Sequence, residues 1–241
     1  MPISITFKSI RAAIRSHALY RQPRPMGIFF KTGPGQYGEG DCGLGVSGGV
    51  LRKIARNFKG VADKTVEALL RSKIHDERQL GLILLTDQMP KADKKRQKQI
   101  AALYLKNRAG VNNWDLVDVS CYKILGPAFG LKILPQLKRW ARDPHATLWE
   151  KRIAIVTTLY FIRQKNPAQT LTLAKILIRE KHDLLQKATG WMLREVGNYC
   201  GREVLEKFLK KHYQAIGRTC LRYAIEKFPE GLRQKYLKGK I

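Results

Sequence analysis

Acidic residues are scarce in this sequence. The chain of 241 residues has 19 Asp and Glu against 46 Lys and Arg, which gives a formal net charge of +27. A chain this basic repels itself when it folds, so we expect a polyanionic partner: nucleic acid first, an anionic membrane surface second. Hydrophobic residues make up 44% of the chain and charged residues 27%. This composition is ordinary for globular proteins and excludes a disordered chain.

Long hydrophobic runs are also missing. The longest nearly unbroken apolar stretches, 80–85 and 153–162, are far shorter than the ~18 residues that a membrane span needs. Basic residues at positions 8, 11 and 15 interrupt the N-terminal segment, so it does not resemble a signal peptide. We predict a cytoplasmic protein, associated with the nucleoid when bound to DNA, whose residues 1–19 form an amphipathic helix.

Cysteine is rare, and no Cys-x-x-Cys pair or histidine at ligand spacing accompanies it. This argues against a disulfide framework or a zinc site, so we expect buried reduced thiols and no metal or other cofactor. Gly33, Gly35 and Gly38 fit the spacing of a dinucleotide-binding loop. More loop follows them in place of a helix, so nucleotide binding is not indicated. The four cysteines are Cys42, Cys121, Cys200 and Cys220.

From residue 47 onward, apolar residues recur with a helical period, and no alternating strand pattern is present. Prolines and glycines divide this part into short helices. The predicted breaks are at Pro90, Gly110, Gly126-Pro127, Asp143-Pro144, Asn166-Pro167, Gly197 and Pro229. Residues 20–46 are rich in glycine and proline and are expected to be a long loop. We therefore predict an all-α protein with a single domain over residues 1–241.

The helices repeat along the chain. Alignment of the apolar runs places five residues in one column, at spacings of 40, 34, 35 and 35 residues: Arg78, Asp118, Arg152, Lys187 and Arg222. Such a period indicates HEAT-like helix-pair repeats that stack into a curved α-solenoid. Equivalent helices then line one concave surface. Four residues of the column are cations, and Asp118 is the one anion.

Six side chains are the candidates for binding and chemistry on that surface. Trp114 and Asp118 are four residues apart, so they share one face of a helix. The other four come from later repeats: Arg152, Lys187, Trp191 and Arg194. An indole ring can stack on a base, and cations hold phosphates. Each candidate also has a structural explanation, since tryptophan often packs in a core, Asp118 could pair with an arginine, and cations often face solvent.

A carboxylate among cations suggests a reaction. Breaking a deoxyribose N-glycosidic bond develops oxocarbenium character on the sugar, which a nearby anion stabilises. A purine alkylated at N3 or N7 already carries positive charge, so it can leave without protonation. Asp118 could then stabilise the sugar and orient the attacking water.

Several motifs of this sequence resemble the DNA alkylation repair family, the AlkD-like glycosylases. They lie at 112–118, 149–156, 187–196 and 221–226, and in the loop at 31–41. The resemblance covers about residues 20–240. It implies a HEAT-like solenoid that removes N3- and N7-alkylated purines from duplex DNA without flipping the lesion into a pocket.

Carried over to this chain, the resemblance implies that Asp118 is the catalytic carboxylate and that Trp114 and Trp191 flank the lesion. It also implies that Arg152 and Arg194 fix the DNA backbone, and we group Lys187 with these two as a DNA-binding residue. Cys42-Gly43 departs from the basic and aromatic residues common at this place among relatives, which leaves that loop contact open.

Three functions therefore remain open. The first is a monofunctional glycosylase that acts as a monomer, without lyase activity because no lysine is placed to form a Schiff base. The second is a non-enzymatic binder of damaged or branched DNA that uses the same basic groove. The third is a helical scaffold for RNA or an acidic protein. A scaffold needs no carboxylate in a cationic column, which argues against the third.

Overall fold

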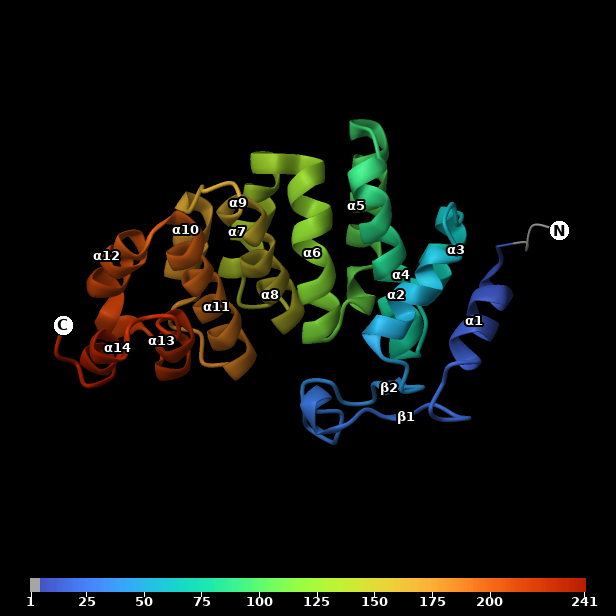
Figure 1. The fold of residues 1–241 in the computed structure, drawn as a ribbon, viewed down its shortest axis with the longest axis horizontal. Helices are drawn as coiled ribbons and strands as arrows, with labels where there is room; N and C mark the ends of the chain where they lie inside the picture. Colours follow the sequence, from blue (N-terminus) through green and yellow to red (C-terminus); the bar gives the residue numbers. More distant parts are fainter. Residues whose placement is uncertain (1–4) are drawn as a thin grey trace. The chain divides into compact units, whose positions relative to one another are not determined.

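The helical period in the sequence corresponds to a chain of helices. The structure is a computed structural model and describes residues 5–241. Its internal packing divides the chain into two compact units, residues 1–124 and 125–241. Figure 1 shows the order of the helices by colour, from blue at the N-terminus to red at the C-terminus. The prediction of an all-α fold is confirmed, while the prediction of a single domain stays a prediction.

The first unit contains the whole of the long loop and the early repeats. Its helices are α1 (Phe7–Arg15), η1 (Ile28–Phe30), α2 (Gly48–Arg56), α3 (Asp63–Leu70), α4 (His75–Gln88), η2 (Met89–Lys91), α5 (Lys94–Lys106) and η3 (Arg108–Gly110). Two short antiparallel strands, β1 (Arg24–Pro25) and β2 (Cys42–Gly43), close the loop. Helix α6 (Trp114–Phe129) begins in this unit and ends in the second.

The second unit continues the pattern. Its helices are η4 (Gly130–Ile133), α7 (Leu134–Arg142), α8 (Leu148–Thr157), α9 (Leu159–Ile162), α10 (Ala168–Leu177), α11 (Asp183–Cys200), α12 (Arg202–His212), η5 (Tyr213–Ala215), α13 (Arg218–Ala224) and α14 (Glu230–Leu237). Among the described residues, no helix combines the length and apolar character that crossing a bilayer requires.

Most helix boundaries follow from local chemistry. Thr147 and Glu150 form a capping box at the start of α8, and the Asp93 carboxylate accepts the Arg96 N–H at 2.7 Å at the start of α5. Five of the predicted breaks separate helices in the structure: those at Pro90, Gly110, Asp143-Pro144, Asn166-Pro167 and Pro229.

Two predicted breaks are wrong. Helix α6 runs through Gly126-Pro127 and ends two residues later, at Phe129; Pro127 removes one backbone donor, and the helix does not stop at it. Helix α11 runs through Gly197, where a Cβ atom would lie 2.9 Å from Leu205 Cδ2. Gly197 therefore permits close packing of α12 and does not stop the helix.

Within each unit, helices pack on helices that lie two or three α-helices later in the chain. In the second unit α8 packs on α11 and α11 on α13, while α7 packs on α10; in the first, α2 packs on α4. Gly190 of α11 lies so close to α13 that a Cβ atom would be 2.4 Å from the Cys220 carbonyl oxygen. This is the packing expected of helix-pair repeats. The five aligned column residues fall in α4, α6, α8, α11 and α13.

The N-terminal segments differ in detail from their prediction. The predicted helix over 1–19 is shorter, Phe7–Arg15, and residues 1–4 of that prediction lie outside the described part of the chain. The predicted loop over 20–46 contains β1, η1 and β2. Cys121 and Cys220 are buried as predicted, whereas Cys42 and Cys200 are half-buried.

Candidate active site and nucleic-acid interface

Trp114, the first residue of α6, is held by the Gly/Pro-rich loop. Its indole Nε1–H donates to the Phe29 carbonyl oxygen at 3.2 Å. Its ring stacks on Phe30, with centroids 5.6 Å apart and an interplanar angle of 15°. In Figure 1 this loop, in blue, lies beside the N-terminal end of α6. The half-exposed indole is thus fixed in orientation from one side.

Asp118 lies one helical turn after Trp114 and is half-buried. Both residues belong to α6 and share one of its faces, as the sequence predicts. Tyr104, packed nearby on α5, is wholly buried. Burial raises the pKa of the Tyr104 hydroxyl well above its ordinary value, and the negative charge of Asp118 adds to the rise. The structure therefore brings one predicted tryptophan and the predicted carboxylate together.

Behind Trp114 lies a buried ionic cluster built on His75. The imidazole Nδ1 is 2.8 Å from Asp41 Oδ2, and Nε2 is 2.8 Å from Asp115 Oδ2. Arg78 Nη2 donates to the other Asp41 oxygen at 2.7 Å. The Phe30 ring meets the His75 ring edge-on, with centroids 5.4 Å apart. The cluster joins three segments: the loop through Asp41, α4 through His75 and Arg78, and α6 through Asp115.

This cluster is charged at neutral pH. Burial alone would lower the pKa of His75, but the hydrogen bonds to Asp115 and Asp41 outweigh it and raise this pKa to about 9. Burial would raise the pKa of Asp41, but the hydrogen bond from His75 and the charge of Arg78 lower it below its ordinary value. An imidazolium thus bridges two carboxylates, an arrangement that fixes the loop against both helix ends.

A cavity of about 300 Å³ opens beside the cluster. Its polar lining includes His75, Asp115 and Gln79, and its apolar lining includes Phe30 and Met26. The Gln79 amide donates to Asp115 at 3.1 Å. Contacts among these side chains hold the cavity wall in place, both where the loop forms it and where the helices form it.

Arg152, predicted to bind DNA, is buried with 5% of its surface exposed. Its Nη1 donates to the Leu184 carbonyl oxygen at 2.6 Å, which links α8 to the start of α11. Arg78 resembles it: this side chain is 4% exposed and donates through Nε to the Gly110 carbonyl oxygen at 3.0 Å. The predicted column is therefore not a continuous exposed row of cations. That Arg152 contacts DNA stays a prediction.

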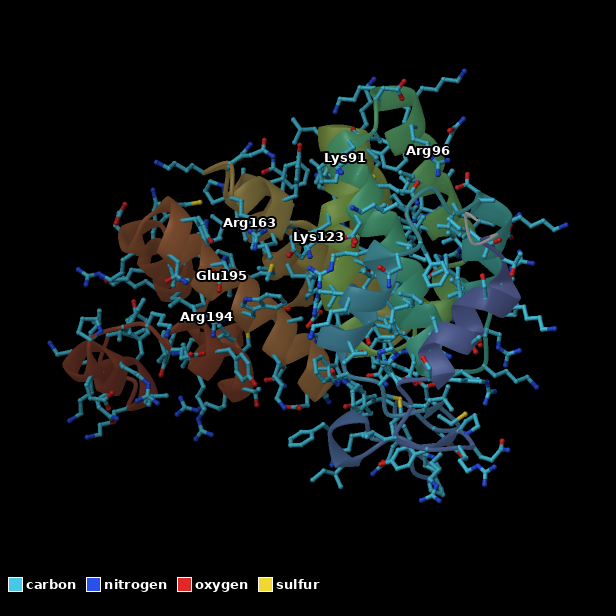
Figure 2. The ribbon with its side chains drawn as sticks, turned by 45° about the vertical axis from the view of Figure 1, so that its right-hand side comes forward. Lys91, Arg96, Lys123, Arg163, Arg194 and Glu195 are labelled. Carbon is cyan, nitrogen blue, oxygen red and sulfur yellow. The ribbon has the colours of Figure 1, made fainter. Side chains whose placement is uncertain are left out.

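The remaining candidates lie on α11 in the second unit. Trp191 Nε1–H donates to Glu195 Oε1 at 3.1 Å, and Arg194 Nη2 donates to the same oxygen at 3.2 Å. Arg194 also pairs with Glu226 through Nη1. Figure 2 shows Arg194 and Glu195 side by side. Lys187 pairs with Asp183 at 2.7 Å. Glu195 thus joins Trp191 to Arg194.

The first unit also has a basic cavity that the repeat alignment missed. It measures about 680 Å³, and its lining combines apolar side chains, which include Phe58 and Leu84, with cations and one acid, Asp87. The cations are Lys59, Lys91, Arg96 and Lys123. Figure 2 labels Lys91, Arg96 and Lys123. Because these side chains come from four separate segments, no spacing in the sequence groups them. Such a rim suits a phosphate group.

Taken together, these features define a strongly basic helical-repeat protein with an aromatic and carboxylate pair on one helix. A family model described as DNA alkylation repair enzyme matches residues 10–228, so the chain belongs to that family. Among solved structures, a predicted DNA alkylation repair enzyme from Enterococcus faecalis has a similar fold, with a TM-score of 0.59 and 15% identity. The match covers 78% of this chain and 89% of that one. No curated protein matches significantly.

Proposed function

We propose that this protein is a monofunctional DNA glycosylase that hydrolyses the N-glycosidic bond of N3- and N7-alkylated purines in duplex DNA. The observation that supports it most is the position of Asp118. This carboxylate is half-buried and shares a face of α6 with Trp114, in a chain of the DNA alkylation repair enzyme family. We expect the protein to act as a monomer, without a cofactor and without a pocket for a flipped base.

The proposed chemistry needs little from the protein. The alkylated purine leaves with its electron pair and becomes neutral, so no acid has to protonate it. Asp118 stabilises the positive charge that develops on the sugar and accepts a proton from the water that attacks C1′. The indole of Trp114 offers a π surface to the sugar or base, and Trp191 is the second indole expected to take part.

Binding is proposed to depend on cations that hold phosphates. Arg152, Lys187 and Arg194 were predicted for this role, and Lys187 and Arg194 also pair with acidic side chains. A phosphate would have to compete with these carboxylates. Lys59, Lys91 and Lys123 are exposed at the basic cavity, so we add them to the proposed phosphate contacts.

The test is release of N7-methylguanine from a duplex by the wild type and by Asp118→Asn. We expect the amide variant to bind the duplex normally and to release base at least about 100-fold more slowly, as when one group that stabilises transition-state charge is removed. The matched control is Glu203→Gln, which neutralises an exposed carboxylate in the first turn of α12. It should leave base release unchanged.

Two results would contradict the proposal. Equal rates for wild type and Asp118→Asn would show that Asp118 is not the catalytic carboxylate. Tight duplex binding with no base release by the wild type would instead establish the alternative, a non-enzymatic binder of damaged or branched DNA. In that case, affinity would respond to the cations and not to Asp118.

A further inference from the structure

Two large apolar side chains project from the Gly/Pro-rich loop beside Trp114. Ile28 is 79% exposed and Phe29 is 77% exposed, although they are neighbours in the short helix η1. Single exposed apolar residues are common on protein surfaces, but adjacent ones at such exposure suggest a contact with another molecule. We call Ile28 and Phe29 the loop tip.

The backbone of the loop tip is fixed. The Phe29 carbonyl oxygen accepts two hydrogen bonds, from Trp114 Nε1 at 3.2 Å and from the Tyr37 hydroxyl at 2.9 Å. On the N-terminal side, the Thr32 hydroxyl donates to the Met26 carbonyl oxygen at 2.9 Å. The exposed side chains are therefore presented by a braced turn rather than by a free loop.

The next residue anchors the loop tip to the first unit. Phe30 is half-buried between Trp114, on which it stacks, and His75, which it meets edge-on. The ionic cluster of His75, Asp41 and Asp115 fastens the far end of the same loop to α4 and α6. The loop tip thus has a set position relative to Trp114, and through α6 relative to Asp118.

The surroundings of the loop tip are basic. Arg21, Arg24 and Lys31 are exposed on the same loop, and Glu39 is its exposed acid. A purely apolar partner would leave these cations without counter-charges. A nucleic-acid duplex suits both features, because its phosphates match the cations and its stacked bases offer an apolar interior.

We propose that Ile28 and Phe29 form a wedge that inserts between base pairs next to the nucleotide bound at Trp114 and Asp118. This rests on the proposed action on DNA. Apolar side chains inserted at a base step unstack it and kink the duplex. Such a kink exposes the glycosidic bond of the neighbouring nucleotide without rotating that nucleotide out of the helix. The wedge thereby gives the protein access to C1′ without requiring a base-binding pocket.

The experiment uses a duplex in which 2-aminopurine, whose fluorescence increases when it unstacks, lies beside N7-methylguanine. Wild-type protein should increase the emission on binding. The double variant Ile28→Ser with Phe29→Ser should bind about tenfold more weakly, because it loses buried apolar surface, and should leave the emission low. Its salt dependence should match that of the wild type, because the phosphate contacts remain.

Two further variants control for unrelated effects. Leu131→Ser removes an exposed apolar side chain, 55% exposed, from η4, and should behave as the wild type does. Phe29→Leu keeps an apolar side chain at the tip and should retain most of the emission increase. Both altered positions of the double variant are exposed, and a melting temperature equal to that of the wild type would show that it folds.

The wedge and the glycosylase activity can fail separately. Base release by a wild type that leaves the emission low would overturn the wedge and keep the glycosylase. Increased emission without base release would keep the wedge on a protein that only binds DNA. An emission increase by the double variant equal to that of the wild type would overturn the wedge. It would indicate instead that the loop tip contacts a protein or a lipid.

Discussion

His75 Nε2 lies 2.8 Å from Asp115 Oδ2, and Asp115 directly follows Trp114 in the first turn of α6. The second imidazole nitrogen binds Asp41 in the Gly/Pro-rich loop. One histidine thus connects the loop that touches Trp114 to the helix that carries Trp114. The position of the indole depends on a contact outside the predicted site residues.

This bridge predicts a pH-dependent stability. The pKa of His75 is raised from 6.5 to about 9 in the folded protein, so folding favours the protonated imidazole. Its contribution, on the order of 3 kcal/mol, is fully present below about pH 6.5 and is lost as the pH rises through about 9. Melting temperatures measured from pH 6 to pH 9.5 should therefore fall for the wild type.

The matched comparison is His75→Gln against His145→Gln. His145 is exposed, so its variant should follow the wild-type curve. His75→Gln should melt at a lower temperature at pH 6 and should lose most of the decline toward pH 9. A decline of the same size in His75→Gln would assign the pH dependence to other groups. The pKa of Asp41 is lowered in the folded protein, so folding favours its ionised form. The stability that this carboxylate contributes should therefore be lost in acid, as the pH falls below the ordinary pKa of an aspartate.

Gly38 predicts a second effect on the same loop. A Cβ atom here would lie 2.5 Å from the Phe30 carbonyl oxygen and 3.2 Å from Asn113 Nδ2, so the backbone of the loop would have to shift. Gly38→Ala should destabilise the protein by about 1–3 kcal/mol, as overpacked substitutions do. Because the shift moves Phe30 and Phe29 away from Trp114, base release should also fall, by about tenfold or more.

Gly40→Ala is not a suitable control, because Gly40 has a positive φ of 76°. Gly27→Ala is better, since a Cβ atom there has no neighbour within 4 Å and Gly27 has a φ of −61°. Denaturant unfolding and base release should both be near wild type for Gly27→Ala. Wild-type unfolding and base release by Gly38→Ala would contradict both predictions, whereas destabilisation with normal base release would show that the loop shifts without moving Trp114.

Arg152 predicts a separation of stability from DNA binding. Because its guanidinium donates to the Leu184 carbonyl oxygen in a buried place, Arg152→Ala should lower the free energy of unfolding by about 1–3 kcal/mol. Chemical denaturation measures this loss. If the variant unfolds as the wild type does, yet its log K against log salt slope falls by about one unit, Arg152 is a phosphate contact instead.

The basic cavity predicts a binding effect without a stability effect. Lys91→Ala and Lys123→Ala remove exposed ammonium groups from its rim. Each should reduce the slope of log K against log salt by about one unit on a plain duplex while the melting temperature stays unchanged. Lys240→Ala, exposed near the C-terminus, is the comparison. Slopes equal to the wild-type value for both rim variants would exclude the cavity from the DNA interface.

Much of the local structure could be predicted from the sequence. Apolar residues at a helical period specify helices, and proline or glycine at most of the predicted breaks ends them, because these effects act over a few residues. Pro127 and Gly197 were misread because their effect depends on context. Pro127 lies at a helix end, and Gly197 faces Leu205 of the next helix.

The candidate site could be predicted only in part. Helical spacing specifies the face of the helix on which a side chain lies, but not how deeply that side chain is buried. Trp114 and Asp118 share a face of α6 as predicted. The same reasoning placed Arg152 among exposed cations, although the neighbouring repeat buries it. No pattern in the sequence links His75 to Asp41 and Asp115, which are 34 and 40 residues away.

The sequence alone determined that this protein is helical, repetitive and strongly basic, because period and charge are properties of the residues themselves. The tertiary structure decided which cations are buried, which carboxylates meet a histidine and what holds Trp114. The bond from Trp114 to the Phe29 carbonyl spans 85 residues of chain. Such a contact exists only because packing brings distant segments together, and neither period nor composition records it.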